Sequence, residues 1–120
     1  MIEKTVLDHL TTALAGVGSD PGVPVGMERP SPLAPTYVVI EKTGSGEANR
    51  LLRAALAVQS IAPTLYEAAV LNERVKTAMR RLPDVSADVF RVECDSDYNF
   101  SDPETKERRY QAVFNIFYLE

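Results

Sequence analysis

The last third of the chain contains two runs in which apolar and polar residues alternate, which is the pattern of strands that bury one face. The run "DVFRVECD" places Phe90, Val92 and Cys94 on one predicted face. The run "RYQAVFNIFYL" builds a larger apolar face from alternate residues, namely Tyr110, Ala112, Phe114, Ile116 and Tyr118. Because a half-buried strand needs a layer to cover it, these two runs predict a sheet packed on other elements.

Two further strands are predicted in the middle of the chain. The segment 36–43 is β-branched and aromatic, and the segment 49–62 alternates, with the glycine-bearing stretch "GSGEA" (44–48) as the turn between them. The leucine and alanine content of 49–62 also suits a helical turn, while the alternation favours a strand.

A helix is predicted at the N-terminus, followed by a segment rich in proline. Apolar residues at three-to-four spacing indicate a helix over 2–15, ended by Gly16 and Gly18. Five prolines follow in "SDPGVPVGMERPSPLAP", and they exclude a regular helix or a central strand there. The apolar residues within 23–27 can add a minor strand at a sheet edge, where proline is tolerated.

A second helix is predicted over 64–82. Thr64 precedes Glu67 by three residues, an arrangement in which the two side chains satisfy the free backbone amides of the first turn. Apolar residues recur at the spacing of a helix face from Ala68 to Leu82, and Pro83 ends this stripe.

The order of predicted elements is helix, two strands, helix, two strands. An α+β fold follows, in which an antiparallel sheet of about four strands packs against two helices. With 120 residues, 45% of them hydrophobic, the chain can bury one core, so residues 1–120 are expected to form a single domain.

Composition excludes several classes of protein. With 13 basic and 17 acidic residues the net charge is −4, and basic clusters are limited to Arg80–Arg81 and Arg108–Arg109, which argues against nucleic-acid binding. The single cysteine, Cys94, cannot form an intrachain disulfide, which fits a reducing compartment. The N-terminus lacks the features of a secretory signal, and the apolar runs are shorter than a membrane span, so we expect a soluble protein with no membrane contact.

The stretch "DSDYNFSDPETKE" resembles a calcium-binding loop at its start. Asp95, Asp97 and Asn99 match the first three ligand positions. Phe100 stands where the loop needs glycine, and Lys106 stands where it needs a bidentate glutamate. We therefore interpret the stretch as a solvated strand end and turn, and predict no metal site.

The residues do not suggest a catalytic site either. A nucleophilic pair would require His9, on the first helix, to meet Cys94, which the alternation places on a buried face. The turn "TGSGEANR" lacks the lysine and the spacing of a phosphate-binding loop. The prediction is a protein that is not an enzyme and binds no cofactor.

Two long runs of the sequence, "QSIAPTLYEAAVLNERVKTAM" and "VECDSDYNFSDPETKERRYQAVFNIFY", resemble the tail-completion, or tail-terminator, proteins of long-tailed bacteriophages and prophages. The similarity covers roughly residues 36–120 and consists of the order and character of four features. These are a strand ending in Gln59-Ser60, a capped helix with Glu67 and Asn72, a turn from Asp97 to Phe100 with Asp102, and a last strand entered by Arg109-Tyr110-Gln111.

The resemblance implies a structural subunit of the virion, made in the host cytoplasm. Such a subunit forms a homo-oligomeric, usually hexameric, ring on the head-proximal end of the tail tube. There it stops tube growth and meets the head–tail connector. The partners implied are therefore other copies of the chain, the tail tube protein and the connector proteins. The turn "TGSGEANR" is short, so a longer family loop at this place would make a different contact.

Candidate contact residues follow from this implication. The predicted turn between the last two strands carries mixed charges that can fix register in a ring. The last strand is also apolar on its second face through Val113, Phe117 and Leu119, which indicates either a partner or cover by the first helix or the proline-rich segment. The residues predicted to contact partners are Arg50, Asp97, Asp102, Arg108, Arg109 and Phe117.

Two alternatives remain open at this stage. A head-completion or connector-stopper subunit of the same virion shares the size and the ring behaviour. A small monomeric domain that binds a ligand or calcium differs in class, and heat stabilisation by its ligand would distinguish it.

Overall fold

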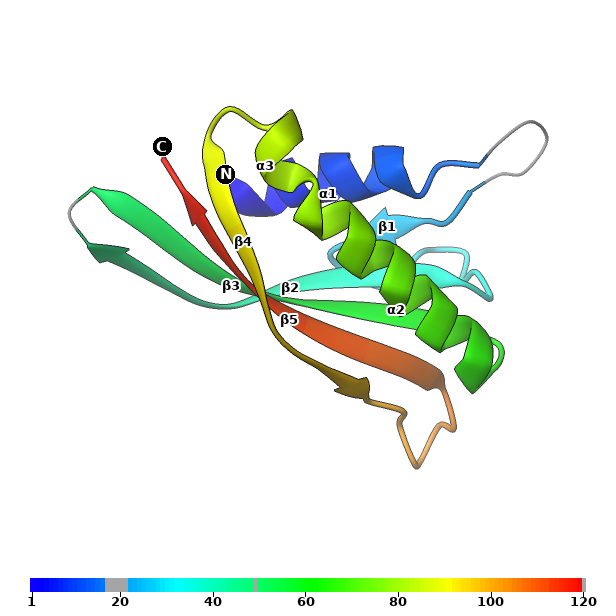
Figure 1. Cartoon of the computed structure of the whole chain (residues 1–120). Helices are drawn as coiled ribbons and strands as arrows, with labels where there is room; N and C mark the ends of the chain where they lie inside the picture. Colours follow the sequence, from blue (N-terminus) through cyan, green and yellow to red (C-terminus); the bar gives the residue numbers. More distant parts are fainter. Residues whose placement is uncertain (17–21, 49, 120) are drawn as a thin grey trace.

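The computed structural model describes residues 1–16, 22–48 and 50–119, which form a sheet and a layer of helices (Figure 1). The elements in chain order are α1 (Ile2–Ala13), β1 (Val25–Gly26), β2 (Tyr37–Ala48), β3 (Leu51–Ala62), α2 (Leu65–Arg80), α3 (Leu82–Val85), β4 (Val89–Asn99) and β5 (Arg108–Tyr118). The predicted α+β class is confirmed.

The described part of the sheet has five strands in the order β1-β2-β3-β5-β4. The four long strands pair with one another in antiparallel fashion, as predicted, so β3 and β5 are central and β4 forms one edge. The predicted minor strand within 23–27 is confirmed as β1, which pairs in parallel with β2 at Val38 and Val39. The sheet is therefore mixed and larger than the four antiparallel strands expected from the alternating runs.

The prediction that "GSGEA" forms a turn is wrong. β2 continues through Gly44 and Gly46, which pair with Ala55 and Arg53 of β3. The ladder absorbs one extra residue as a bulge between Lys42 and Gly44, and the chain reverses at Arg50, whose positive φ of 68° suits a tight turn. Residue 49 lies outside the described residues. Glycines lower strand propensity, but an adjoining strand in register outweighs that cost.

The three described helices lie on one face of the sheet (Figure 1). α1 covers β1 and β2, and α2 covers β3, β5 and β4. α1 ends at Ala13, close to its predicted end, while Gly18 lies outside the described residues. Among the described helices, none is long and apolar enough to cross a bilayer. The core between helices and sheet includes Val6, Leu10, Ile40, Leu56, Val75, Met79, Phe114 and Ile116.

The predicted cap of the second helix is present at the N-terminus of α2. Thr64 is extended (φ −124°, ψ 157°), and its hydroxyl oxygen accepts a hydrogen bond from the Glu67 N–H at 3.1 Å. The same hydroxyl donates to the Glu67 carboxylate at 3.1 Å, in place of the backbone bond of the usual capping box. A single-turn helix, α3, follows α2 and has Pro83 in its first turn.

Replacing Thr64 with alanine is expected to lower the free energy of unfolding by about 1 kcal/mol, because one amide of the first turn loses its acceptor. Thermal or urea unfolding of the variant measures this loss. Thr64→Ser keeps the oxygen and should recover most of it; a serine variant as unstable as the alanine variant would contradict the capping role.

The prediction that Phe90, Val92 and Cys94 share a buried face is confirmed for Val92, which packs against the core, and is wrong for Phe90. Cys94 shares the face of Val92, opposite the buried Phe114, but is itself exposed. Bulges between Val89 and Arg91 and between Cys94 and Ser96 shift the alternation of β4 twice. Val89 is buried, whereas Phe90 is 48% exposed and Cys94 is exposed. A bulge adds one residue to a strand and turns the following side chains to the other face, which a regular period of two cannot anticipate.

Candidate interaction site

In the described part of the chain, no helix covers the sheet face opposite the helical layer (Figure 1). Phe117 lies half-buried on this open face, and its ring centroid is 6.4 Å from that of Phe90. The Arg91 guanidinium lies 5.6 Å from the centre of the Phe117 ring, in the range of a cation–π contact. We call these three residues the aromatic cluster. Because α1 packs on the other face, cover by the first helix is not the reason for the apolar side chains.

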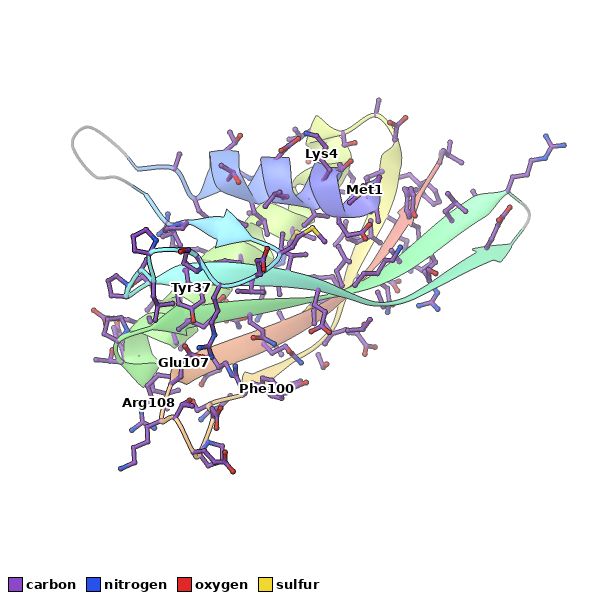
Figure 2. All side chains as sticks on the ribbon, turned by 180° about the vertical axis from the view of Figure 1, so that it is seen from behind. Met1, Lys4, Tyr37, Phe100, Glu107 and Arg108 are labelled. Atoms are coloured by element: carbon purple, nitrogen blue, oxygen red, sulfur yellow. The ribbon has the colours of Figure 1, made fainter. Side chains whose placement is uncertain are left out.

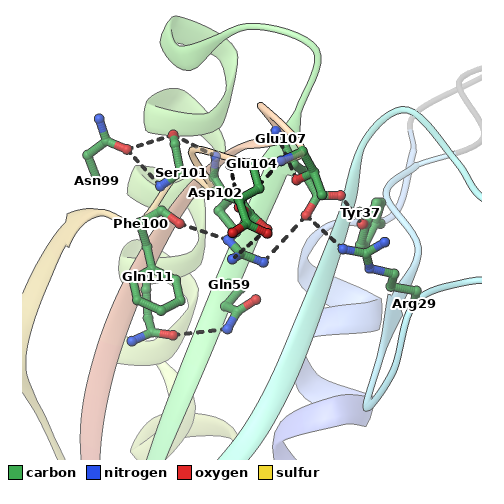
Figure 3. A network of polar contacts seen from close by, with 12 residues as sticks. Arg29, Tyr37, Gln59, Asn99, Phe100, Ser101, Asp102, Glu104, Glu107 and Gln111 are labelled. Atoms are coloured by element: carbon green, nitrogen blue, oxygen red, sulfur yellow. Dashed lines mark hydrogen bonds and ion pairs between the residues drawn. The ribbon is translucent and has the colours of Figure 1, made fainter.

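The opposite end of the open face holds a polar network centred on Glu107 (Figure 3). Its carboxylate accepts hydrogen bonds from the Tyr37 hydroxyl at 2.7 Å, from Arg29 at 3.2 Å and from Arg109 at 3.4 Å. Tyr37 is only 2% exposed. The network therefore joins the proline-rich segment, the start of β2 and the start of β5. Viewed from behind, Tyr37 and Glu107 lie near the same end of the sheet, with Arg108 beyond them (Figure 2).

Arg109 and Asp102 shape the connection between β4 and β5. The Arg109 side chain, 19% exposed, donates to the Phe100 carbonyl oxygen at 2.7 Å, lies over the Phe100 ring and comes within 4.0 Å of Asp102. Asp102 accepts hydrogen bonds from the N–H groups of Glu104 and Thr105, at 2.9 and 3.4 Å. The Glu104 N–H in particular holds the pKa of Asp102 below its usual value. Both predicted contact residues thus maintain the shape of the connection.

Asp97 lies on the helical face of β4, away from this connection. Its carboxylate is 3.1 Å from the Lys76 ammonium group and accepts a hydrogen bond from Asn72 at 3.4 Å. Hydrogen bonds to Glu73 and then to Asp97 raise the pKa of Lys76. Asp97 therefore connects the edge strand β4 to α2. Its side chain remains 32% exposed.

The six predicted contact residues do not form one patch. Asp102 and Arg109 lie together in the β4–β5 connection, and the exposed Arg108 begins β5 beside them. Arg50 is exposed at the tip of the β2–β3 hairpin, which projects beyond the helical layer (Figure 1). Asp97 and Phe117 lie on opposite faces of the sheet. Glu107 and Tyr37 are not among the predicted residues, because a contact between residues 70 positions apart leaves no local pattern in the sequence.

The hydroxyl of Tyr37 predicts a loss of stability at high pH. Burial first, and then the bond to Glu107, raise the pKa of Tyr37 to about 12 from its ordinary value near 10. The unfolded chain therefore releases this proton at lower pH than the folded chain. The stability from this group is complete below about pH 10 and is lost as the pH rises toward 12. Unfolding measured from pH 9 to 12 should show a steeper decline for the native chain than for Tyr37→Phe; equal slopes would contradict the assignment.

The two residues considered for nucleophilic catalysis have different roles in the structure. His9 lies in a groove of about 880 Å³ between α1, α2 and α3, where its Nε2–H donates to the Ala78 carbonyl oxygen at 2.6 Å. Cys94 lies on β4, where partial desolvation and the Asp97 carboxylate raise the pKa of its thiol. Within residues 1–16, 22–48 and 50–119, no group of three or more acidic, histidine or cysteine side chains is placed to hold a metal ion.

The start of the calcium-like stretch is a strand in the structure. Asp97 belongs to the regular part of β4 and contacts α2, while the Asn99 side-chain oxygen accepts bonds from the N–H and hydroxyl of Ser101. The two oxygens therefore serve separate contacts, one on the helical face and one in the turn.

Comparison with protein-family models gives no match for this chain, and comparison with curated proteins gives none. The resemblance to tail terminators therefore depends on the quoted residues alone.

Proposed function

We propose that this chain is a structural subunit of a long-tailed phage or prophage, and that it forms a ring which caps the head-proximal end of the tail tube and joins it to the head connector. The observation that carries the proposal is the aromatic cluster on the open face of the sheet. It is an apolar surface on a small domain whose three described helices cover the other face of the sheet.

A ring of identical subunits needs two different complementary surfaces on each subunit. The aromatic cluster and the β4–β5 connection, at the two ends of the open face, both adjoin β4, and together they supply one of these surfaces. Because the charges of Glu107, Arg109 and Asp102 are bonded within the chain, the connection presents a fixed shape. Preorganised surfaces lose little conformational entropy on docking, which suits permanent assembly.

The remaining exposed charges then set the orientation in which neighbouring subunits dock. Arg50 at the hairpin tip and Arg108 at the start of β5 are solvated in the single chain. Charges of this kind at the rim of an interface fix register and exclude wrong partners more than they add affinity.

Replacing Phe117 with glutamate tests the proposal. The variant should fold, since Phe117 is only half-buried, and should fail to form rings or to bind the ends of tail tubes. Val85→Glu is the matched control, because Val85 is 69% exposed on α3 in the helical layer. Sedimentation velocity and electron microscopy of tube ends measure both effects. Normal ring formation by Phe117→Glu would contradict the proposal.

Binding preference identifies the virion part that the ring contacts. A tail terminator should bind tail tubes and stop their growth, whereas a head-completion subunit should bind heads that contain DNA. A monomer that is heat-stabilised by calcium and binds neither particle would instead show a ligand-binding domain.

A further inference from the structure

In the described part of the chain, the two lateral edges of the sheet, at β2 and at β4, have no neighbouring strand along most of their length. β1 covers β2 only at Val38 and Val39, so the outer edge of β2 from Ile40 onward has no strand beside it among the described residues. β4 pairs with β5 on one side, and in the same described ranges its other edge pairs with no strand. Glu41 and Lys42 on β2 and Tyr98 on β4 are exposed, so solvent reaches both edges.

We propose that β4 of one copy pairs with β2 of the next copy, so that the sheets of a ring are continuous. This inference rests on the proposed ring function and names the surface through which the ring forms. Main-chain pairing at an exposed edge is a general mode of protein association.

The strand directions permit this pairing in a ring. Because each long strand is antiparallel to its neighbour along the order β2-β3-β5-β4, the two outer strands run in opposite directions. When two copies stand side by side in the same orientation, as in a ring, β4 of one copy is therefore antiparallel to β2 of the next. A sheet whose outer strands ran in the same direction would give only the parallel ladder, which is less stable per residue.

The backbone amides that face outward define the register. The Val38 N–H donates to the Pro24 carbonyl oxygen, on the outer side of β2, so by alternation the N–H groups of Ile40 and Lys42 also point outward. On β4, the Phe100 N–H donates inward to the Arg109 carbonyl oxygen, so the N–H groups next in alternation along the strand, at residues 99 and 97, point outward.

The first free outward residue of β2 is Ile40, and the last outward residue of β4 is Asn99. Pairing these two leaves β1 in place and sets Asp97 opposite Lys42. Both side chains lie on the helical face, where Lys42 is 3.8 Å from Glu3 and Asp97 is 3.1 Å from Lys76. The contact would complete a row of alternating charges across the boundary, and opposite charges in directly opposed positions stabilise a strand pair.

The bulges of both strands restrict the pairing to this short stretch. The bulge between Cys94 and Ser96 ends the regular part of β4 on one side, and the bulge between Lys42 and Gly44 ends that of β2. Bulges on edge strands oppose indiscriminate pairing, so they favour one register over many.

Engineered disulfides test the register. In this register Glu41 and Tyr98 are opposed on the open face as a pair without mutual hydrogen bonds, with Cα atoms about 4.5 Å apart, which a disulfide spans. In a Cys94→Ser background, the variant with Glu41→Cys and Tyr98→Cys should form a ladder of linked multimers on oxidation. The control combines Glu41→Cys with Glu93→Cys, which lies on the same strand further from the proposed partner and should remain unlinked.

Sedimentation of the unlinked Cys94→Ser protein separates the two levels of the proposal. Rings without a Glu41–Tyr98 ladder, or with an equal ladder in the Glu93 control, would overturn the edge pairing and leave the ring function standing. A chain that stays monomeric both in solution and on tail tubes would overturn both. Rings with a ladder specific to Glu41 and Tyr98 support both.

Discussion

Replacing Phe114 with alanine is expected to lower the free energy of unfolding by roughly 3–5 kcal/mol. Phe114 is 1% exposed and lies on central strand β5 between Leu56 of β3 and Cys94 of β4, in the core beneath the helices. Removing the ring leaves a cavity that rigid neighbours on both sides cannot fill. For a domain of this size such a loss is a large part of the total stability, and urea unfolding measures it.

Phe117→Ala, three residues further along the same strand, is the matched control. Phe117 lies on the open face, so the same truncation creates no enclosed cavity. It should lower the free energy of unfolding by less than about 1.5 kcal/mol. Equal losses in the two variants would mean that the open face is as well packed as the helical face, which would contradict the proposed interaction surface.

Replacing Glu107 with alanine is expected to lower the free energy of unfolding by roughly 2–4 kcal/mol. The change removes the acceptor of the buried Tyr37 hydroxyl and leaves Arg29 and Arg109 without this carboxylate. A buried polar group without a partner keeps its full desolvation penalty. Thermal unfolding measures the loss, and Glu104→Ala, an exposed carboxylate in the same connection, should remain within about 0.5 kcal/mol of the native chain.

A double-mutant cycle isolates the bond between Tyr37 and Glu107. If the hydroxyl is the main partner, Tyr37→Phe should reduce the cost of Glu107→Ala, because the phenyl ring leaves no unpaired donor. Strictly additive losses from the two changes would show that Glu107 acts through Arg29 and Arg109 alone.

Sequence patterns formed by residues close together in the chain predicted the fold class correctly. The cap at Thr64, the apolar stripe of α2 and the alternation from Tyr110 to Tyr118 each depend on residues within a few positions of one another, and each is present in the structure. The same holds for the small edge strand β1, which follows from where proline is tolerated.

Features that depend on a partner strand could not be predicted. The glycines of β2 suggest a turn when they are considered alone, and only the register with β3 carries the strand through them. The bulge of β4 between Val89 and Arg91 turns Phe90 to the open face for the same kind of reason. The Glu107 network joins residues up to 78 positions apart, so charged residues that suggested recognition are in part bonded within the chain.

The sheet order also has a consequence for synthesis of the protein on the ribosome. β3 has β2 beside it as soon as both have been made, but its other neighbour, β5, is made only after α2, α3 and β4. Until β5 leaves the exit tunnel, the apolar residues of β3 and the underside of α2 stay exposed in the nascent chain. Slow expression or added chaperones should therefore raise the yield of folded protein, since incomplete chains present both an apolar face and an unpaired strand.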